Sequence, residues 1–198
     1  EKSRLKIPLI FAADVIHGFR TVFPMPLAEA GSFDPELAER TARIAAIEAT
    51  AAGIDWNFAP MVDIARDQRW GRGIEGAGED VLLSRIMADA RVRGFQGHAG
   101  LAAPDAMAAC AKHFAAYGAA EGGLDYNSVD VSERTLREVY FPPFQAALDA
   151  QRSLAGTGRH RAVGMGRPTD RHPCQLQPRQ PVRALPAVGR AGHPPIGA

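Results

Sequence analysis

The sequence predicts an α/β fold in which helices cover a parallel sheet. Strand-like apolar runs alternate with helix-like segments over residues 1–150, an order typical of a parallel sheet covered by helices. Polar residues also gather where each run ends. A closed (β/α)8 barrel and an open doubly wound sheet both fit this order. No GxGxxG or GxxxxGK[ST] motif stands directly after a predicted strand, which disfavours the nucleotide-binding form of the open sheet.

The first elements are a strand, a helix and a second strand. Residues 8–13 form a short apolar run that ends in a polar, turn-rich stretch, which predicts a buried strand. An Asp N-cap, a proline at the first helical position and apolar residues at helical spacing predict a helix from Pro35 that ends before Gly53. Residues 54–59 alternate and are rich in aromatics, which predicts the next strand.

The remaining elements continue the alternation. In order, they are a loop over 61–78, a helix over 81–95, a strand over 108–114, a loop over 117–127 and a helical stretch from Ser132. Pro142 and Pro143 predict a break in that last helix, because proline removes a backbone donor and clashes with the preceding turn. Loops of this length inside a compact domain are usually functional.

The charge is divided unevenly along the chain. Residues 1–150 contain 15 basic and 21 acidic residues, a net charge of −6, whereas residues 151–198 contain eight Arg and one Asp, a net charge of +7. The second segment also holds seven Pro, seven Gly and no aromatic residue, so it cannot bury enough apolar surface to order itself. We therefore expect one domain over 1–150 and a disordered, irregular Arg/Pro/Gly-rich tail over 151–198.

Several partners are disfavoured by composition. The tail lacks the Lys and aromatic residues typical of a nucleic-acid-binding arm, and the main domain is acidic, so no nucleic-acid partner is expected. No run of apolar residues is long enough to span a membrane. The beginning of the chain carries no signal-peptide pattern, so the sequence does not predict a compartment. The two cysteines do not have zinc-binding spacing, and no metal site is expected.

Polar residues at the predicted strand ends are the candidate functional groups. Asp14 follows the first strand, and Lys112 and His113 end the third. The loop after the second strand, residues 66–73, places three arginines beside a tryptophan, a combination suited to sugar hydroxyls or carboxylates. An ordinary loop turn at Asp14 and an ordinary strand end at Lys112 explain the same residues without function.

Five segments, in the same order as in the family, resemble glycoside hydrolase family 3 and in particular its bacterial β-glucosidases. They are KIPLIFAADVIHG over 6–18, TVFP over 21–24, APMVDIARDQRWGR over 59–72, Glu79-Asp80, and KHFAAYG over 112–118. The resemblance implies that residues 1–150 are a partial (β/α)8 TIM-type barrel, incomplete at both ends. It also implies a retaining hydrolase of terminal non-reducing β-D-glucosyl residues, with a β-glucoside or oligosaccharide as substrate and no cofactor.

The resemblance also implies which residues bind the sugar. They are Asp14, Arg72, Lys112 and His113, with Arg69 nearby. The related β-N-acetylglucosaminidase branch carries a catalytic histidine in the loop that follows the Lys-His motif, whereas residues 115–127 here contain none. This favours the glucosidase branch, with the N-acetylglucosaminidase and β-xylosidase branches as alternatives. Bacterial members of the family are often periplasmic or secreted.

The catalytic groups of the family are missing from the sequence. Retaining hydrolysis uses two carboxyl groups about 5–5.5 Å apart. The family takes its nucleophile from a Ser-Asp-Trp or Ser-Asp-His motif, which this chain lacks, and its acid/base glutamate usually from a second domain. We expect no catalytic residue and no activity in this chain alone. The alternatives are a complementing chain that supplies the nucleophile, and a non-catalytic sugar-binding fragment.

The tail has a second interpretation. Codons compatible with residues 170–178, shifted by one base, permit Thr-Gly-Ile-Pro-Ala-Asn-Ser-Asn-Arg, which is similar to what the family carries at this place. The Arg, Pro, Gly and His content is also what a GC-rich gene gives when it is read out of frame. We therefore hypothesise that residues 151–198 are frameshifted translation.

Overall fold

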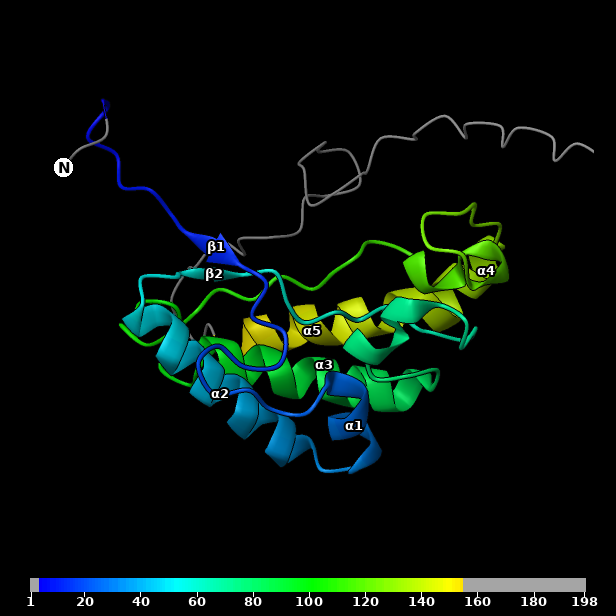
Figure 1. Cartoon of the computed structure of the whole chain (residues 1–198), viewed down its shortest axis with the longest axis horizontal. Helices are drawn as coiled ribbons and strands as arrows, with labels where there is room; N and C mark the ends of the chain where they lie inside the picture. Colours follow the sequence, from blue (N-terminus) through cyan, green and yellow to red (C-terminus); the bar gives the residue numbers. More distant parts are fainter. Residues whose placement is uncertain (1–3, 155–198) are drawn as a thin grey trace, which may run out of the picture.

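Helices carry most of the architecture in the computed structural model, which describes residues 4–154 (Figure 1). The elements are β1 Ala12–Ala13, α1 Pro26–Gly31, α2 Pro35–Ala51, β2 Trp56–Asn57, η1 Gly71–Glu75, α3 Val81–Gln96, η2 Tyr117–Ala119, η3 Glu121–Gly123, α4 Glu133–Thr135, the π turn η4 Leu136–Tyr140 and α5 Phe141–Leu154. Most of the predicted tail over 151–198 lies outside the described residues, which end at Leu154. The hypothesis of a shifted reading frame concerns the same residues.

The expected parallel pairing is present. Strand β1 pairs with β2 in parallel, with Ala12 opposite Trp56. The segment that follows α3 forms one isolated parallel bridge to β2, between Trp56 and Ala108, and a second one beyond the end of β2, between Met61 and Lys112. The three segments therefore lie side by side in chain order with a helix between each pair, which is the α/β alternation that the sequence predicts.

The predicted strand lengths are wrong. The runs over 8–13 and 54–59 contribute two strand residues each, and the run over 108–114 contributes only the two bridges. An apolar run forms a strand where neighbouring backbone and covering side chains are present. Here Leu9 and Ile10 are 68% and 72% exposed, so the first run lacks the cover that its composition predicts.

Helices α2 and α3 begin where the sequence predicts, because each has a strong local start signal. The Asp34 carboxylate accepts a hydrogen bond from the Leu37 N–H (2.9 Å), and the Asp80 carboxylate accepts one from the Leu83 N–H (2.7 Å). Such N-caps satisfy donors that have no partner within the helix. The loop over 17–26 leads into α1, a short helix that we did not predict although it begins at Pro26.

The predicted break at Pro142 and Pro143 is wrong. Both prolines lie in the first turn of α5, and the Phe141 N–H just before them bonds to the Leu136 carbonyl five residues back, so α5 continues directly from the preceding turn. The turn before them, Leu136–Tyr140, is a π turn, so the irregularity precedes the prolines. Helix α5 then runs without interruption to Leu154.

The main core joins the three long helices to the strand segments. Figure 1 shows α2, α3 and α5 side by side next to β1 and β2, and α3 packs against both other helices. The largest side chains of this core are Val15, Val62, Phe95, Met107 and Phe144. No helix within residues 4–154 has the length and apolar character needed to cross a bilayer.

Helix α2 buries small residues rather than its large apolar ones. Its buried face is formed by Ala38, Thr41, Ala42, Ala45, Ala46 and Ala49. Ile44 and Ile47, whose spacing helped to predict the helix, are 43% and 45% exposed. A Cβ at Gly94 of α3 would lie 2.4 Å from the Glu39 carbonyl oxygen and 2.6 Å from the Ala42 Cβ. The two helix backbones therefore approach closely at this point.

We predict that Gly94→Ala destabilises the domain although alanine is the better helix former. The added methyl group must displace α2, and overpacking of this kind costs about 1–3 kcal/mol. The control is Gly31→Ala at the end of α1, where an added Cβ meets nothing within 4 Å. That change is expected to be neutral or to stabilise by less than about 1 kcal/mol. Urea unfolding of both variants measures the difference, and equal stability would contradict the close approach.

Candidate functional site

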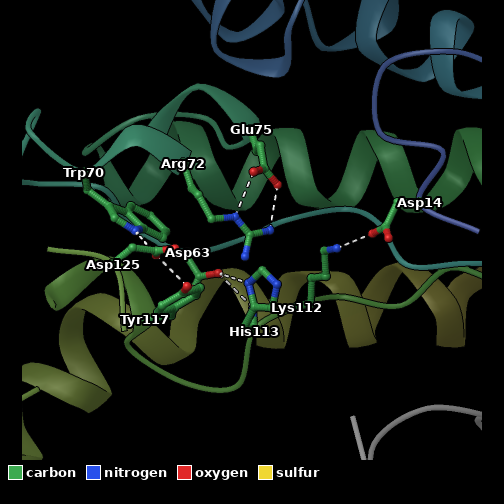
Figure 2. Close-up of polar contacts among 9 residues, drawn as sticks. All are labelled: Asp14, Asp63, Trp70, Arg72, Glu75, Lys112, His113, Tyr117 and Asp125. Atoms are coloured by element: carbon green, nitrogen blue, oxygen red, sulfur yellow. Dashed lines mark hydrogen bonds and ion pairs between the residues drawn. The ribbon is translucent and has the colours of Figure 1, made fainter. Parts of the chain in front are cut away.

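Four of the five candidate residues meet at the carboxyl ends of the strand segments. Asp14 follows β1, Arg72 lies in η1 after β2, and Lys112 and His113 end the third segment; Figure 2 shows their side chains together. The Lys112 ammonium forms an ion pair with the Asp14 carboxylate. Lys112 is largely buried, with a side chain 15% exposed, whereas Asp14 is 55% exposed. A positively charged donor and a negatively charged acceptor thus lie side by side at the carboxyl ends of the strand segments.

The backbone next to Asp14 is held by a buried amide. The Asn57 side chain accepts a hydrogen bond from the Val15 N–H (2.8 Å) and donates one to the Val15 carbonyl (2.9 Å). Asn57 is fully buried, so its partners replace water completely. Arg91 of α3 donates a further hydrogen bond to the Ile16 carbonyl. The backbone that follows Asp14 is therefore fixed at three polar groups, two of Val15 and one of Ile16.

Arg91 belongs to a buried ion pair that connects three helices. Its guanidinium lies 2.5 Å from the Glu29 carboxylate of α1, and the Thr41 hydroxyl of α2 donates to the same carboxylate (2.7 Å). Burial lowers the pKa of Arg91, and the Glu29 carboxylate opposes this effect. A buried charge without a partner is strongly destabilising, so the pair secures the loop of Asp14 as well as the helices.

Arg72 is fixed in η1 by a two-pronged ion pair. Its Nε and Nη2 atoms each lie 2.8 Å from a carboxylate oxygen of Glu75. The guanidinium carbon lies 5.5 Å from the centre of the Tyr117 ring. The hydrogen bonds to Glu75 raise the pKa of Arg72. Arg72 is therefore a permanent, oriented donor at the site.

His113 is paired with a buried carboxylate. The Asp63 Oδ2 atom lies 2.8 Å from the backbone nitrogen of His113 and 2.8 Å from its ring Nδ1. The Asp63 side chain is fully buried, and the His113 side chain is 13% exposed. His113 also meets Tyr117 edge to face, with ring centres 5.2 Å apart. The ring is therefore held in one orientation.

Asp125 anchors the aromatic side of the site. Its Oδ1 atom accepts hydrogen bonds from the Trp70 indole N–H (2.8 Å) and from the Tyr117 hydroxyl (2.5 Å). Burial alone would raise the pKa of Asp125, but the donors Tyr117 and Trp70 lower it below its ordinary value. Burial and the hydrogen bond to Asp125 raise the pKa of Tyr117. The tyrosine therefore stays a neutral donor.

Of the candidate residues, Arg72 and His113 border an open cavity of about 210 Å³, whereas the Asp14–Lys112 ion pair does not line it. Its lining consists of Arg72, His113, Phe114, Ala115, Tyr117, Tyr126 and Val129. Polar groups at the edge of an aromatic surface suit a ligand that has both hydroxyl groups and apolar faces. Within residues 4–154, no group of three or more His, Cys, Asp or Glu is arranged to hold a metal ion.

The fifth candidate lies apart from the others. Arg69 is 73% exposed and pairs with Asp67 (2.6 Å), and it does not line the cavity. The hydrogen bonds from Arg69 lower the pKa of Asp67 to about 2. Sequence reasoning missed Asp63, Glu75, Tyr117 and Asp125, which support the site, and it singled out Trp70 without its partner Asp125. Several of them stand inside the motifs quoted above, but their partners are revealed only by the fold.

Comparison with known proteins identifies the family. The model described as Glycosyl hydrolase family 3 N terminal domain matches residues 1–158. The chain belongs to glycosyl hydrolase family 3. A periplasmic beta-glucosidase of Salmonella typhimurium is 50% identical over 148 residues, which are 75% of this chain and 19% of that protein. A putative beta-xylosidase of Formosa agariphila is 35% identical over 165 residues, which are 81% of this chain and 22% of that protein.

Solved structures of family 3 enzymes agree with this assignment. The beta-glucosidase from Listeria innocua in complex with glucose is 52% identical, with a TM-score of 0.73, and the match covers 75% of this chain and 21% of that one. The chain thus spans about a fifth of the length of the relatives it matches. It is similar to the N-terminal domain of these enzymes.

We predict that Asp125→Ala destabilises the domain by about 1–3 kcal/mol at neutral pH, because the Trp70 indole N–H is left without an acceptor. Trp70 is only 2% exposed, so water cannot replace that acceptor fully. Asp125→Asn retains an acceptor and is expected to cost less than about 1 kcal/mol, since solvent screens the lost charge.

The difference between the wild type and Asp125→Asn should depend on pH. The pKa of Asp125 lies below its ordinary value of 3.8, so the charge contributes stability above that value and the contribution is lost as the pH falls through the folded-state pKa. Urea unfolding in neutral and acidic buffers tests this. A difference that grows towards low pH would contradict the assigned hydrogen bonds.

Proposed function

We propose that this chain supplies the sugar-binding side of a β-glucosidase active site and recognises a terminal non-reducing β-D-glucosyl residue. The observation that carries the proposal is that Arg72 and His113 line the aromatic cavity while Lys112, the neighbour of His113 in the chain, forms an ion pair with Asp14. The names of two relatives support the sugar: the Salmonella typhimurium protein is a beta-glucosidase, and the Listeria innocua enzyme has been crystallised with glucose.

The donor and acceptor groups match the chemistry of a sugar. Each hydroxyl group can donate one hydrogen bond and accept others. Lys112 and Arg72 can only donate, and the Asp14 carboxylate can only accept. A pair of adjacent hydroxyls placed between them satisfies both kinds of group at once. Arg69 takes a peripheral role, because its ion pair with Asp67 holds it on the exposed side of the loop.

The domain that carries this site is a partial (β/α)8 barrel over residues 1–150, incomplete at both ends. The three parallel segments in chain order, with helices α2 and α3 between them, support this architecture. The likeness to the Listeria innocua enzyme, of which the chain covers 21%, supports it as well. Sites of such barrels lie at the carboxyl ends of the strands, which is where these residues meet.

Hydrolysis needs carboxyl groups from elsewhere. Within the described residues, each carboxylate beside the site already has a donor partner: Asp14 has Lys112, Asp63 has His113, Glu75 has Arg72, and Asp125 has Trp70 and Tyr117. None of them stands free as a nucleophile or acid. The proposal therefore assigns binding to this chain and turnover to groups supplied by a longer or complementing chain.

The test is glucose binding by the 198-residue chain, measured by calorimetry. Asp14→Ala is expected to weaken binding about 10- to 100-fold, because hydrogen bonds to a charged group are worth about 1.5–3 kcal/mol. Asp149→Asn, which removes an exposed carboxylate from α5, is the matched control and should bind as the wild type does. Binding that is unchanged by Asp14→Ala would contradict the assigned site.

Three further ligands define the branch and the chemistry. Weaker binding of xylose and N-acetylglucosamine than of glucose is expected for a glucosidase. An aryl β-glucoside should not be hydrolysed by this chain, and turnover would show that a carboxylate beside the site acts as nucleophile.

A further inference from the structure

We propose that Asp63 is a positioning residue that fixes the tautomer of His113, so that the ring presents Nε2 as a hydrogen-bond acceptor to the cavity. The role of that acceptor in holding a sugar hydroxyl rests on the function proposed above. The tautomer itself does not, because it follows from contacts inside the protein.

Asp63 accepts both of the hydrogen bonds that it forms with His113. The backbone N–H of His113 can only donate, and it lies 2.8 Å from Asp63 Oδ2. Oδ2 is therefore an acceptor at this position. The ring Nδ1 of His113 lies at the same distance from the same oxygen, so Nδ1 carries the proton that completes the second hydrogen bond.

The burial of Asp63 prevents water from replacing it as the acceptor for His113. Its side chain is fully buried, so water does not compete for Oδ2. The second oxygen, Oδ1, is buried and has no hydrogen-bond partner among the described residues. Rotation of the carboxylate would merely bring the other oxygen to the same two donors. Asp63 therefore offers His113 an acceptor in either orientation.

The ring nitrogen opposite Nδ1 is Nε2, and it is the atom of His113 that a ligand can reach. His113 lines the cavity, and Figure 2 shows its imidazole between Asp63 and the cationic side chains of Arg72 and Lys112. In a neutral imidazole with the proton on Nδ1, Nε2 is an acceptor. A hydroxyl that donates to Nε2 can at the same time accept from one of the two cations.

The opposite tautomer would change the site. With the proton on Nε2, His113 would be a third donor beside Arg72 and Lys112, and Asp14 would be the sole acceptor in this group. A hydroxyl could then no longer donate to His113. Asp63 therefore sets the direction of a hydrogen bond that it does not itself make.

The tautomer is measured by NMR of the full chain labelled with ¹⁵N at histidine, well above the ordinary histidine pKa of about 6.5. The wild type is expected to show Nδ1–H at His113. Asp63→Ala should move His113 towards Nε2–H. Asp63→Asn should retain Nδ1–H, because the amide oxygen can take the place of Oδ2 opposite the backbone N–H.

The same spectra contain an internal control. The His17 Nδ1 atom lies 2.9 Å from the Phe23 carbonyl oxygen, which fixes the same tautomer by a contact that Asp63 does not touch. His17 should remain Nδ1–H in all three proteins, and its signal also shows that each variant is folded. A change at His17 together with His113 would indicate general disruption and would overturn the specific role of Asp63.

Glucose binding completes the test. Asp63→Ala is expected to weaken binding about tenfold, the value of one hydrogen bond, whereas Asp63→Asn should stay within about threefold of the wild type. An Nε2–H tautomer in the wild type overturns the proposal without any variant, as does an unchanged tautomer in folded Asp63→Ala. A wild type with the expected tautomer that binds no glucose would refute the sugar-binding function and leave the positioning by Asp63 supported.

Discussion

The arrangement of the site depends on the buried amide of Asn57. Its backbone N–H donates to the Ala108 carbonyl (2.8 Å), and its side chain pairs with both backbone groups of Val15. One residue of β2 thereby connects the segment that leads to Asp14 with the segment that leads to Lys112. Because these groups are buried, each unmade hydrogen bond would keep its full desolvation cost. These hydrogen bonds of Asn57 set the position of Asp14 relative to Lys112.

The site residues are ordered by their partners before a ligand arrives. Arg72 and His113 are each held by a carboxylate that does not line the cavity. Asp14 and Lys112 instead hold one another, so a ligand must insert between them or share their hydrogen bonds. Preorganised groups lose little side-chain freedom on binding, which leaves more of the interaction free energy for affinity. Recognition is thus concentrated at the Asp14–Lys112 pair.

The sequence predicts what local signals determine and fails where distant partners decide. Helix α2 was predictable because Asp34 caps it within one turn, and α3 because apolar residues recur along it at helical spacing. Strand lengths were not, since pairing depends on neighbours elsewhere in the chain. Asp14, Lys112 and His113 were found because they end apolar runs, whereas Asp63 meets its histidine 50 residues later. No periodicity reveals such a pairing.

The alanine-lined contact between α2 and α3 constrains how this domain can diverge. Its residues lose almost no side-chain freedom on folding, and they bury little area each, so the contact gains its strength from the proximity of the two backbones. Volume rather than polarity is therefore the property under selection. The alanines of α2 cannot be replaced there by larger residues, and Gly94 of α3 has no room even for alanine, while the outward isoleucines Ile44 and Ile47 are free to change. The buried face of α2 therefore limits the size of a substituted side chain, whereas the exposed face does not.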